Sequence, residues 1–221
     1  MRINDIVGVI PVRKGSQRVK NKNLRPFADS NLLSIKIKQL KKLGLRKIIV
    51  NTDSDLAIRI AIDCNVDYHL REKYFASSEC SGSEYFEHIA HVTDAENILL
   101  APVTAPLISI SSYEKAINEY FSSNCNSLMS IKVIQEFLWF NNKPINYDLK
   151  SAPNSQELPK YFTPTFGIII ANRMAMLESK NVICSNPHFF EITQEESIDI
   201  DTELDFDFAE FLYKKIVKNE H

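Results

Sequence analysis

The chain has 221 residues, which is enough for one sizeable α/β domain or at most two small ones. Hydrophobic residues make up 44% and charged residues 24%, a globular composition that excludes a disordered or fibrous protein. The formal net charge of -2 provides no overall attraction to nucleic acid or to an anionic membrane. We therefore expect neither nucleic acid nor a membrane as a partner.

The N-terminal apolar run, 6–12, ends at Arg13 and is too short for the core of a signal peptide. The longest other apolar stretch, 98–110, is interrupted by Pro102 and Pro106 and cannot span a bilayer. The four cysteines form no CxxC pair and the five histidines no HxxxH pattern. These features predict a cytoplasmic protein with reduced thiols and no zinc site.

Short apolar segments rich in β-branched residues, as is typical of buried parallel strands, alternate along the chain with segments of helical period. The predicted strands are 6–12, 47–51, 67–70, 97–101, 127–133 and 166–171. The predicted helices are 33–43 with a stop at Gly44, 56–64, 84–93, 111–121 with a capping box at 111–114, and 202–218. This alternation predicts one α/β domain, 1–221, with a Rossmann-like, doubly wound, mainly parallel sheet.

Residues 134–164 do not fit the alternation, because they contain the only Trp, four prolines and no clear period. We interpret them as an insertion that leaves the sheet, either as a lid over its own domain or as an arm that meets another subunit. Aromatic residues such as Trp139 and Phe140 are costly to leave in water, and a rim of Asn and Lys is typical of an interface. This composition favours an arm in a homodimer.

The first strand ends in a basic loop, 13–23, with five cations, one Gly and two Asn. Ligands of open α/β sheets bind at the carboxyl ends of the strands. Free N–H groups and several cations at that edge suit a polyphosphate, although neither a Walker loop nor a GxGxxG motif is present. The alternative is a solvated basic turn. The position after the first strand favours anion binding.

A second charged cluster lies near the C-terminus, where Asp199 and Asp201 alternate with isoleucines. On a strand both carboxylates would face the same way, and two adjacent carboxylates require protons or a cation. Mg²⁺ binds one or two carboxylates together with phosphate oxygens. Alternatively, Asp201 or Thr202 caps the last helix with Asp205 as its partner, which leaves Asp199 unexplained.

A polyphosphate loop beside a metal-binding carboxylate pair predicts nucleotidyl transfer. In this reaction class a hydroxyl group attacks the α-phosphorus, Mg²⁺ offsets charge on the phosphoryl oxygens, and cations hold the leaving pyrophosphate. These features identify neither the base nor the acceptor.

Several motifs, in order along nearly the whole chain, resemble those of the CMP-sialic acid synthetases, or acylneuraminate cytidylyltransferases. The sequence IPVRKGS at 10–16, followed by KNKNL at 20–24, is similar to the family form ARxGSKxxxxKN. Further similar segments lie at 51–55, 70–77, 99–107 and, very closely, 197–205. The resemblance implies a nucleotide-diphospho-sugar transferase fold, CTP and an acidic sugar as substrates, Mg²⁺ as cofactor, and a homodimer whose arm reaches the partner's active site.

The resemblance also implies roles for individual residues. Arg13, Ser16 and Lys22 match positions that hold the CTP phosphates, and Asn23 and Arg71 match positions near the cytidine. Gly82 stands where the family has a Ser that contacts the base, so Ser81 or Ser83 is expected to substitute for it. The implied metal ligands are Asp199 and Asp201, and the implied catalytic residues are Arg13, Lys22 and Asp201.

Departures from the family pattern concern the acceptor sugar. Ala101 stands where the family has a Gln that contacts the sugar, and the segment 163–169 lacks the family's Arg. Arg is a natural partner of a carboxylate, so these changes argue against ordinary N-acetylneuraminate. Ala101 also argues against the CMP-Kdo synthetases, which have an Asp there. Lys150 or Lys160 of the arm could supply a cation to the neighbouring site.

The predicted function is a cytidylyltransferase that activates a nonulosonic or other acidic sugar for surface glycan assembly. One alternative is a nucleotidyltransferase of the same fold with another acceptor, such as a Kdo-like acid or a phosphorylated or non-sugar alcohol. The other is a nucleotide-binding subunit without turnover. The aspartate pair favours an enzyme, because nucleotide binding alone would not require it.

Overall fold

The structure is a computed structural model that describes residues 2–15, 19 and 21–219. Its strands are β1 (Ile6–Val12), β2 (Lys47–Thr52), β3 (Asp67–Leu70), β4 (Asn97–Leu100), β5 (Ser127–Ile134), β6 (Trp139–Phe140), β7 (Lys143–Pro144), β8 (Tyr161–Asn172) and β9 (Pro187–Glu191). Its α-helices are α1 (Leu32–Lys41), α2 (Asp55–Asp63), α3 (Lys73–Ala76), α4 (Gly82–Val92), α5 (Ile110–Ser122), α6 (Arg173–Ser179) and α7 (Glu203–Asn219). Short 3₁₀ turns lie at Arg2–Asp5, Leu149–Ser151 and Ser155–Glu157.

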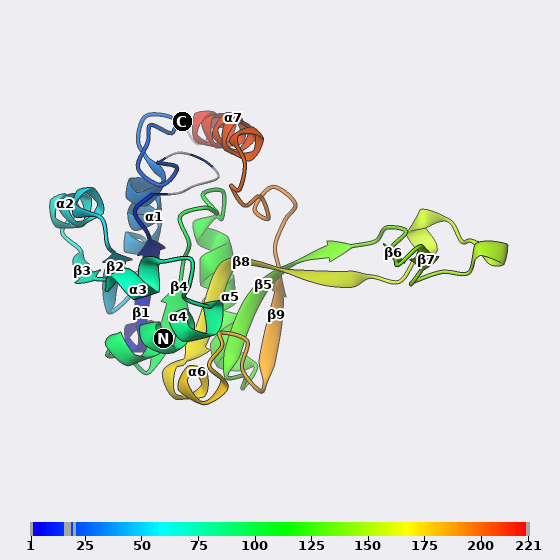
Figure 1. Cartoon of the computed structure of the whole chain (residues 1–221), viewed down its shortest axis with the longest axis horizontal. Coiled ribbons are helices and arrows are strands. Elements are labelled where there is room, and N and C mark those ends of the chain that lie inside the picture. The colour runs from blue at the N-terminus through cyan, green and yellow to red at the C-terminus, as the bar shows by residue number, and fades with distance from the viewer. Residues whose placement is uncertain (1, 16–18, 20, 220–221) are drawn as a thin grey trace.

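Seven strands form one sheet in the order β3-β2-β1-β4-β8-β5-β9 (Figure 1). Strands β1 to β4 run parallel to one another, and β9 runs parallel to β5. The doubly wound, mainly parallel sheet predicted from the sequence is confirmed. Strands β2 and β3 lie on one side of β1 and β4 lies on the other, which places a topological switch point between β1 and β4, where ligands of such sheets bind.

The predicted direction of the strand at 166–171 was wrong. This strand, β8, pairs antiparallel with both β4 and β5, and it begins at Tyr161. No crossover helix separates β5 from β8 in the described chain, and strands joined without a crossover pair antiparallel. Strand β9 and helices α3 and α6 were not predicted, because each is a short element with little period of its own.

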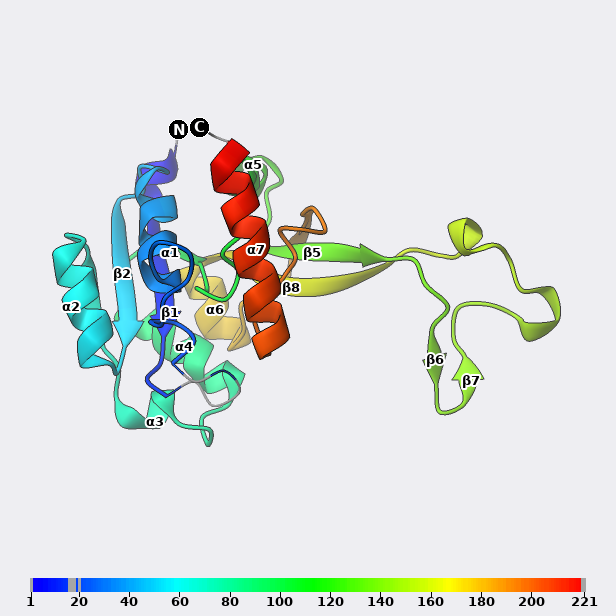
Figure 2. The same ribbon diagram turned by 90° about the horizontal axis from the view of Figure 1, so that it is seen from above.

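Side chains alternate between two cores on the two faces of the sheet. In β1, Ile6 and Ile10 belong to the larger cluster, whereas Val7 and Val9 belong to the smaller one. Helices α1, α2, α5 and α7 contribute to the larger cluster, and α4 and α6 to the smaller one. Figure 2 shows α1 and α7 on the same side of the molecule. Both faces of the sheet are therefore covered, which explains the continuous apolar runs of its strands.

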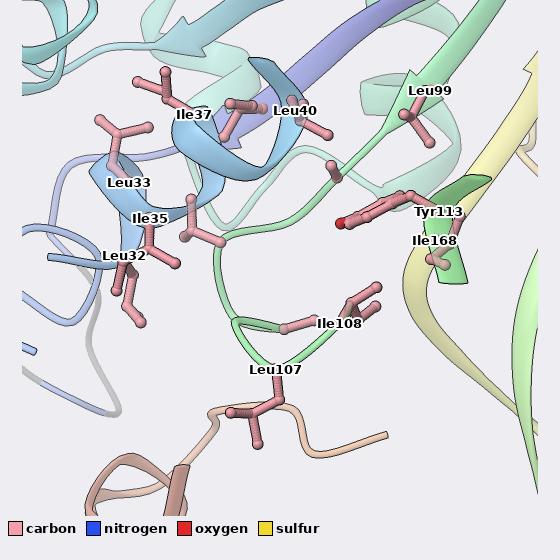
Figure 3. Packing of buried hydrophobic residues seen from close by; sticks show 14 of the residues in the cluster. Leu32, Leu33, Ile35, Ile37, Leu40, Leu99, Leu107, Ile108, Tyr113 and Ile168 are labelled. Carbon is pink, nitrogen blue, oxygen red and sulfur yellow. The ribbon is translucent and has the colours of Figure 1, made fainter. Parts of the chain in front are cut away.

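Helix α1 forms the centre of the larger core. Asn31 caps its first turn by accepting a hydrogen bond from the backbone N of Ser34 at 2.9 Å. Figure 3 shows its leucine and isoleucine side chains in the cluster that also contains Tyr113 of α5 and Ile168 of β8. The chain turns away at Gly44, whose φ of 68° favours glycine, as the predicted helix stop required.

The two predicted capping boxes had different outcomes. Helix α7 has the predicted one, because Thr202 Oγ accepts from the N of Asp205 at 3.2 Å and Asp205 Oδ2 accepts from the N of Thr202 at 2.7 Å. Helix α5 begins earlier than predicted and is capped by Ser109. The carboxylate of Glu196 accepts from Ser109 N and Ser112 Oγ, so a group distant in sequence replaces the predicted local partner.

Residues 134–164 project from the body of the molecule (Figures 1 and 2). Strands β5 and β8 continue outward as a pair, with Ile134 opposite Tyr161. Beyond them, β6 and β7 form a hairpin whose turn consists of Asn141 and Asn142 at φ of 48° and 60°, values that suit a two-residue turn. Among the helices in the described part of the chain, none is both long and apolar enough to cross a membrane.

A fully buried lysine connects α1 to the loop that follows β4. The ammonium group of Lys36 donates to the carbonyl oxygen of Ala105 at 2.8 Å and to the hydroxyl oxygen of Tyr113 at 2.9 Å. Burial lowers the pKa of Lys36 to about 7. The side-chain nitrogen of Lys36 therefore positions the loop, and its charged form is held there against a desolvation cost.

Lys36 should make the free energy of unfolding depend on pH. Between pH 7 and 10.5 the unfolded chain binds this proton and the folded chain releases it, so the stability contribution rises with pH and is lost as pH falls towards 7. The expected slope is up to about 1.4 kcal/mol per pH unit. Lys36→Met should flatten it in urea denaturation between pH 7 and 9.5, and Lys38→Met, at an exposed site on α1, should not. An unchanged slope in Lys36→Met would contradict the assignment.

Candidate active site

A cavity of about 640 Å³ opens at the carboxyl ends of the first four strands, at the topological switch point. Its wall comes from the basic loop after β1, the residue after β3, the segment from α3 into α4, the loop after β4, and the acidic segment before α7. Residues far apart in sequence thus meet at one edge of the sheet.

Seven of the nine residues predicted for the site lie on this wall, and they come from four separate segments. They are Arg13, Lys22, Asn23, Arg71, Ser81, Asp199 and Asp201. Ser83 does not line the cavity and lies exposed in the first turn of α4. Ser16 lies outside the described residues.

Lys22 connects the basic loop to the acidic segment. Its ammonium group is buried, donates to the carbonyl oxygen of Ile200, and lies 3.9 Å from Asp201 Oδ1. The backbone N of Ile200 donates in turn to the carbonyl oxygen of Thr104 at 2.9 Å. The segment with the two aspartates is therefore held between the basic loop and the loop after β4.

The strand geometry considered for the two aspartates in the sequence analysis does not occur. Residues 199–201 have no regular secondary structure, because the backbone groups of Ile200 bond to Lys22 and Thr104. The alternation itself is retained, since Ile200 is buried while Asp199 and Asp201 line the cavity. A segment without regular secondary structure thus places both carboxylates on the same side, as a strand would.

Arg71 is fixed at the other end of the cavity by several acceptors. Its Nε donates to Asn51 Oδ1 at 2.6 Å, and its Nη2 donates to the carbonyl oxygen of Asn51 at 2.7 Å and to Tyr85 Oη at 2.9 Å. The guanidinium carbon lies 4.6 Å from the centroid of the Tyr85 ring. Burial raises the pKa of Tyr85 to about 12, so its hydroxyl keeps the proton that it donates to Asn51 Oδ1.

Asn23 presents a buried acceptor at the cavity wall. Its Nδ2 donates to the carbonyl oxygen of Arg13 at 3.5 Å, but its Oδ1 has no hydrogen-bond partner among the described residues. Buried polar atoms in folded proteins are nearly always hydrogen-bonded. A donor on a bound ligand, such as a hydroxyl or an amino group, would satisfy this oxygen.

Ser81 takes part in a capping box at the start of α4. Its Oγ accepts from the N of Glu84 at 3.2 Å and donates to Glu84 Oε2 at 2.6 Å. Hydrogen bonds from Ser81 and Tyr74 lower the pKa of Glu84 to about 2, so this carboxylate stays ionised. The hydroxyl of Ser81 can therefore offer a ligand only its remaining acceptor capacity.

Three residues that shape the site had no assigned role in the sequence analysis. Asn51 and Tyr85 hold Arg71, and Asp53 Oδ1 accepts from the backbone N of Lys14 at 2.7 Å and so anchors the basic loop. Asn51 and Asp53 lie within a segment that resembles the family. Tyr85 gave no comparable signal, because it sits within an amphipathic helix.

No cluster of three or more His, Cys, Asp or Glu suitable for a metal occurs among the described residues. Asp199 and Asp201 nevertheless fit Mg²⁺, which typically uses one or two carboxylates and takes its other ligands from phosphates and water. Arg13 and Lys22 share the wall with them and can hold phosphate oxygens. The arrangement is suited to binding a nucleoside triphosphate.

Comparisons with known proteins support the same interpretation. Post-translational flagellin modification protein B of Campylobacter coli is 26% identical over 96% of this chain and 97% of its own. The N-acylneuraminate cytidylyltransferase of Escherichia coli O18:K1:H7 is 27% identical over 95% of this chain but 52% of its own, so this chain spans about half that relative. The pseudaminic acid cytidylyltransferase of Campylobacter jejuni is 23% identical over 93% of this chain and 95% of its own.

Solved structures share the fold. A CMP:2-keto-3-deoxy-manno-octonic acid synthetase, solved in complex with CTP, superposes with a TM-score of 0.69 at 16% identity, covering 95% of this chain and 98% of that one.

The sequence profile of the family described as Cytidylyltransferase matches residues 7–219. Because this match covers nearly the whole chain, the protein belongs to the cytidylyltransferase family and is a CTP-dependent enzyme.

Proposed function

We propose that this enzyme transfers CMP from CTP to the hydroxyl group of a nonulosonic or similar acidic sugar and releases pyrophosphate, for surface glycan assembly. The observation that carries the proposal is that the two sides of the cavity carry different functional groups. Arg13, Lys22 and the two aspartates share the wall formed by the basic loop and the acidic segment, whereas Arg71 and Ser81 come from the β3–α4 side. The relatives named for N-acylneuraminate and pseudaminic acid support the acceptor class.

Arg13 and Lys22 hold the triphosphate in this proposal. Cations on phosphate oxygens make strong, charge-assisted hydrogen bonds and stabilise charge that develops on the leaving pyrophosphate. Ser16 of the same loop is proposed as a further phosphate contact. Asn23 and Arg71 face the cytidine, and Asn23 Oδ1 offers an acceptor to it.

Asp199 and Asp201 would hold Mg²⁺ together with phosphate oxygens of the nucleotide. When bound, the ion offsets negative charge on the phosphoryl oxygens during the transfer. The chain's own contribution is to keep both carboxylates at the cavity, through the buried side chain of Ile200 and its two backbone hydrogen bonds.

The acceptor side of the cavity is the part that differs from the family pattern. Ala101 is buried and does not line the cavity, and the wall after β4 consists of Pro102, Val103 and Thr104. This wall offers no cation to a sugar carboxylate. A cation from the arm of a second subunit would fit this requirement.

Pyrophosphate release tests the proposed function. We would supply each nucleoside triphosphate in turn, with Mg²⁺, against a panel of nonulosonic acids, a Kdo-like acid and phosphorylated and non-sugar alcohols. The proposal expects release only with CTP and a nonulosonic or similar acidic sugar. Release only with a phosphorylated or non-sugar alcohol, or a preference for another nucleotide, would overturn it.

Asp201→Asn should lower kcat by at least about 100-fold, because the amide retains the shape but loses the charge that holds the metal ion. Asp207→Asn, at an exposed position of α7, should leave kcat unchanged. Circular dichroism would check that both variants fold. A normal rate in Asp201→Asn at ordinary Mg²⁺ concentration would contradict the metal assignment.

Arg71→Lys should raise the KM for CTP by about tenfold or more, because an ammonium group cannot reproduce the forked donors that engage Asn51 and Tyr85. Steady-state kinetics at saturating acceptor would measure this. Arg59→Lys, on the exposed face of α2, is the matched control and should not change KM. Equal KM values in both variants would remove Arg71 from the nucleotide site.

We also propose a homodimer in which the arm, 134–164, meets the partner subunit. Large apolar side chains are exposed on it, with Phe137 44%, Trp139 52% and Phe140 67% accessible. Aromatic surface of this kind favours an interface over solvent. The cavity wall described above includes no residue of the arm. The residues that line the cavity therefore do not favour an arm that closes over its own site as a lid.

Light scattering at low micromolar concentration should therefore give the mass of a dimer, and a monomeric mass would refute the proposed assembly.

If Lys150 or Lys160 reaches the neighbouring site, a Lys150→Ala/Lys160→Ala variant should lose activity with the acidic sugar. Mixing its subunits with Asp201→Asn subunits should restore part of the activity, because one site of each heterodimer would be intact. No recovery in heterodimers verified by mass would contradict the shared site.

A further inference from the structure

Arg71 is held by a chain of hydrogen bonds that continues away from the cavity to a histidine. Asn51, which is 1% exposed, lies between them at the end of β2. Its side-chain Oδ1 accepts from Arg71 Nε at 2.6 Å and from Tyr85 Oη at 3.2 Å. Its Nδ2 lies 3.0 Å from Nδ1 of His69 on β3.

The donors in this chain determine its protonation. Arg71 Nε can only donate, so the atom of the Asn51 amide that faces it must be the oxygen. The Nδ2 of Asn51 can likewise only donate, and it faces His69. Nδ1 of His69 must therefore accept, which requires a neutral imidazole with its proton on Nε2.

Protonation of His69 disrupts this arrangement. Nδ1 then carries a hydrogen that faces the amide hydrogens of Asn51. Rotating the amide would satisfy His69, but it would turn the two Nδ2 hydrogens towards Arg71 Nε, which is also a donor. In either orientation one pair of donors faces each other, and a buried donor without an acceptor is costly.

We propose that His69 is a positioning residue that makes the binding of CTP by Arg71 depend on pH, because only the neutral imidazole lets Asn51 fix the guanidinium group. The inference rests on the proposed CTP site, since it matters for function only if Arg71 contacts the nucleotide. His69 itself does not line the cavity.

The surroundings of His69 place its titration in the acid range. Burial lowers its pKa, the charge of Arg71 lowers it further, and the charge of Glu72 opposes them. On the α4 side it faces His88, whose ring centroid is 5.6 Å away and whose pKa is also lowered, mainly by burial. On the β2 side it faces the neutral Asn51. The pKa of His69 therefore lies below that of an ordinary histidine, so the imidazole is neutral at pH 7.5 and is protonated only in the acid range.

The test is the Kd for CTP, measured by calorimetry with Mg²⁺ between pH 7.5 and 5.5. In the wild-type enzyme the Kd should rise as the pH falls through the acid range, by at most about tenfold per pH unit once the imidazole takes up its proton, as expected when the affinity of a ligand is linked to one deprotonated group. His69→Asn puts a non-titrating acceptor, Oδ1, at the place of Nδ1. It should remove most of that rise. Titration of CTP itself is common to both proteins, so the difference between the profiles isolates the imidazole.

Two further variants separate His69 from its neighbours. His88→Asn removes the other histidine of this cluster and should retain the wild-type profile. In Asn51→Asp a carboxylate would accept from both Arg71 and a protonated His69, so the loss of affinity at pH 5.5 should disappear or reverse. Circular dichroism would check folding, and if Asn51→Asp does not fold, the comparison of His69→Asn with His88→Asn decides the question.

The inference would be overturned if the Kd of His69→Asn for CTP rose at low pH as much as that of the wild type. It would also be overturned if the Kd of His88→Asn, and not that of His69→Asn, became independent of pH. Wild-type enzyme that binds no CTP at pH 7.5 would overturn the proposed function and this inference with it. Tight binding at pH 7.5 with the same acid loss in wild type and His69→Asn would overturn the inference alone.

Discussion

The buried ammonium group of Lys22 donates to the carbonyl oxygen of Ile200, 178 positions further along the chain, and lies beside the carboxylate of Asp201. Burying a charge is costly unless acceptors and an opposite charge compensate it, so this contact joins its two segments strongly. Because Ile200 also bonds to Thr104, three loops from three parts of the sequence converge on one buried lysine. The geometry of the phosphate end of the cavity depends on this convergence, and the cation proposed to hold phosphates also positions the aspartates proposed to hold the metal ion.

The other end of the cavity is organised independently. Arg71 is held by Asn51 and Tyr85, and neither belongs to the loops around Lys22. The sheet explains how two separate networks serve one ligand, because β1 to β4 are parallel and their carboxyl ends lie together at the switch point. A nucleoside triphosphate has the same two-part character, with a charged phosphate end and a neutral base that is read by hydrogen bonds. The arm projects from the body of the molecule (Figure 1), and in the proposed homodimer it would bring a cation to the acceptor side of the neighbouring site.

The sequence was sufficient for features that are local. Strand β1 has the predicted bounds, because its apolar run is bordered by charge, and Thr202 caps α7 with Asp205 as local spacing required. Strand direction was not predictable in the same way, since periodicity reports which face is buried and says nothing about whether β8 runs up or down. Lys36 shows the same limit, because a lysine in an amphipathic helix is expected at the surface, and its acceptors Ala105 and Tyr113 lie 69 and 77 residues away in the sequence. The placement of site residues on one wall followed from the sheet, but their hydrogen-bond partners required the three-dimensional structure.

A crystal structure of this enzyme with CTP and Mg²⁺ would test the central claim most directly, which is that the two ends of the cavity hold the two ends of one nucleotide. We expect the triphosphate in contact with Arg13 and Lys22, a metal ion at Asp199 and Asp201, and the cytosine on the side of Arg71. A nucleotide bound outside this cavity, or one with its phosphates at Arg71 and its base at Lys22, would contradict the account.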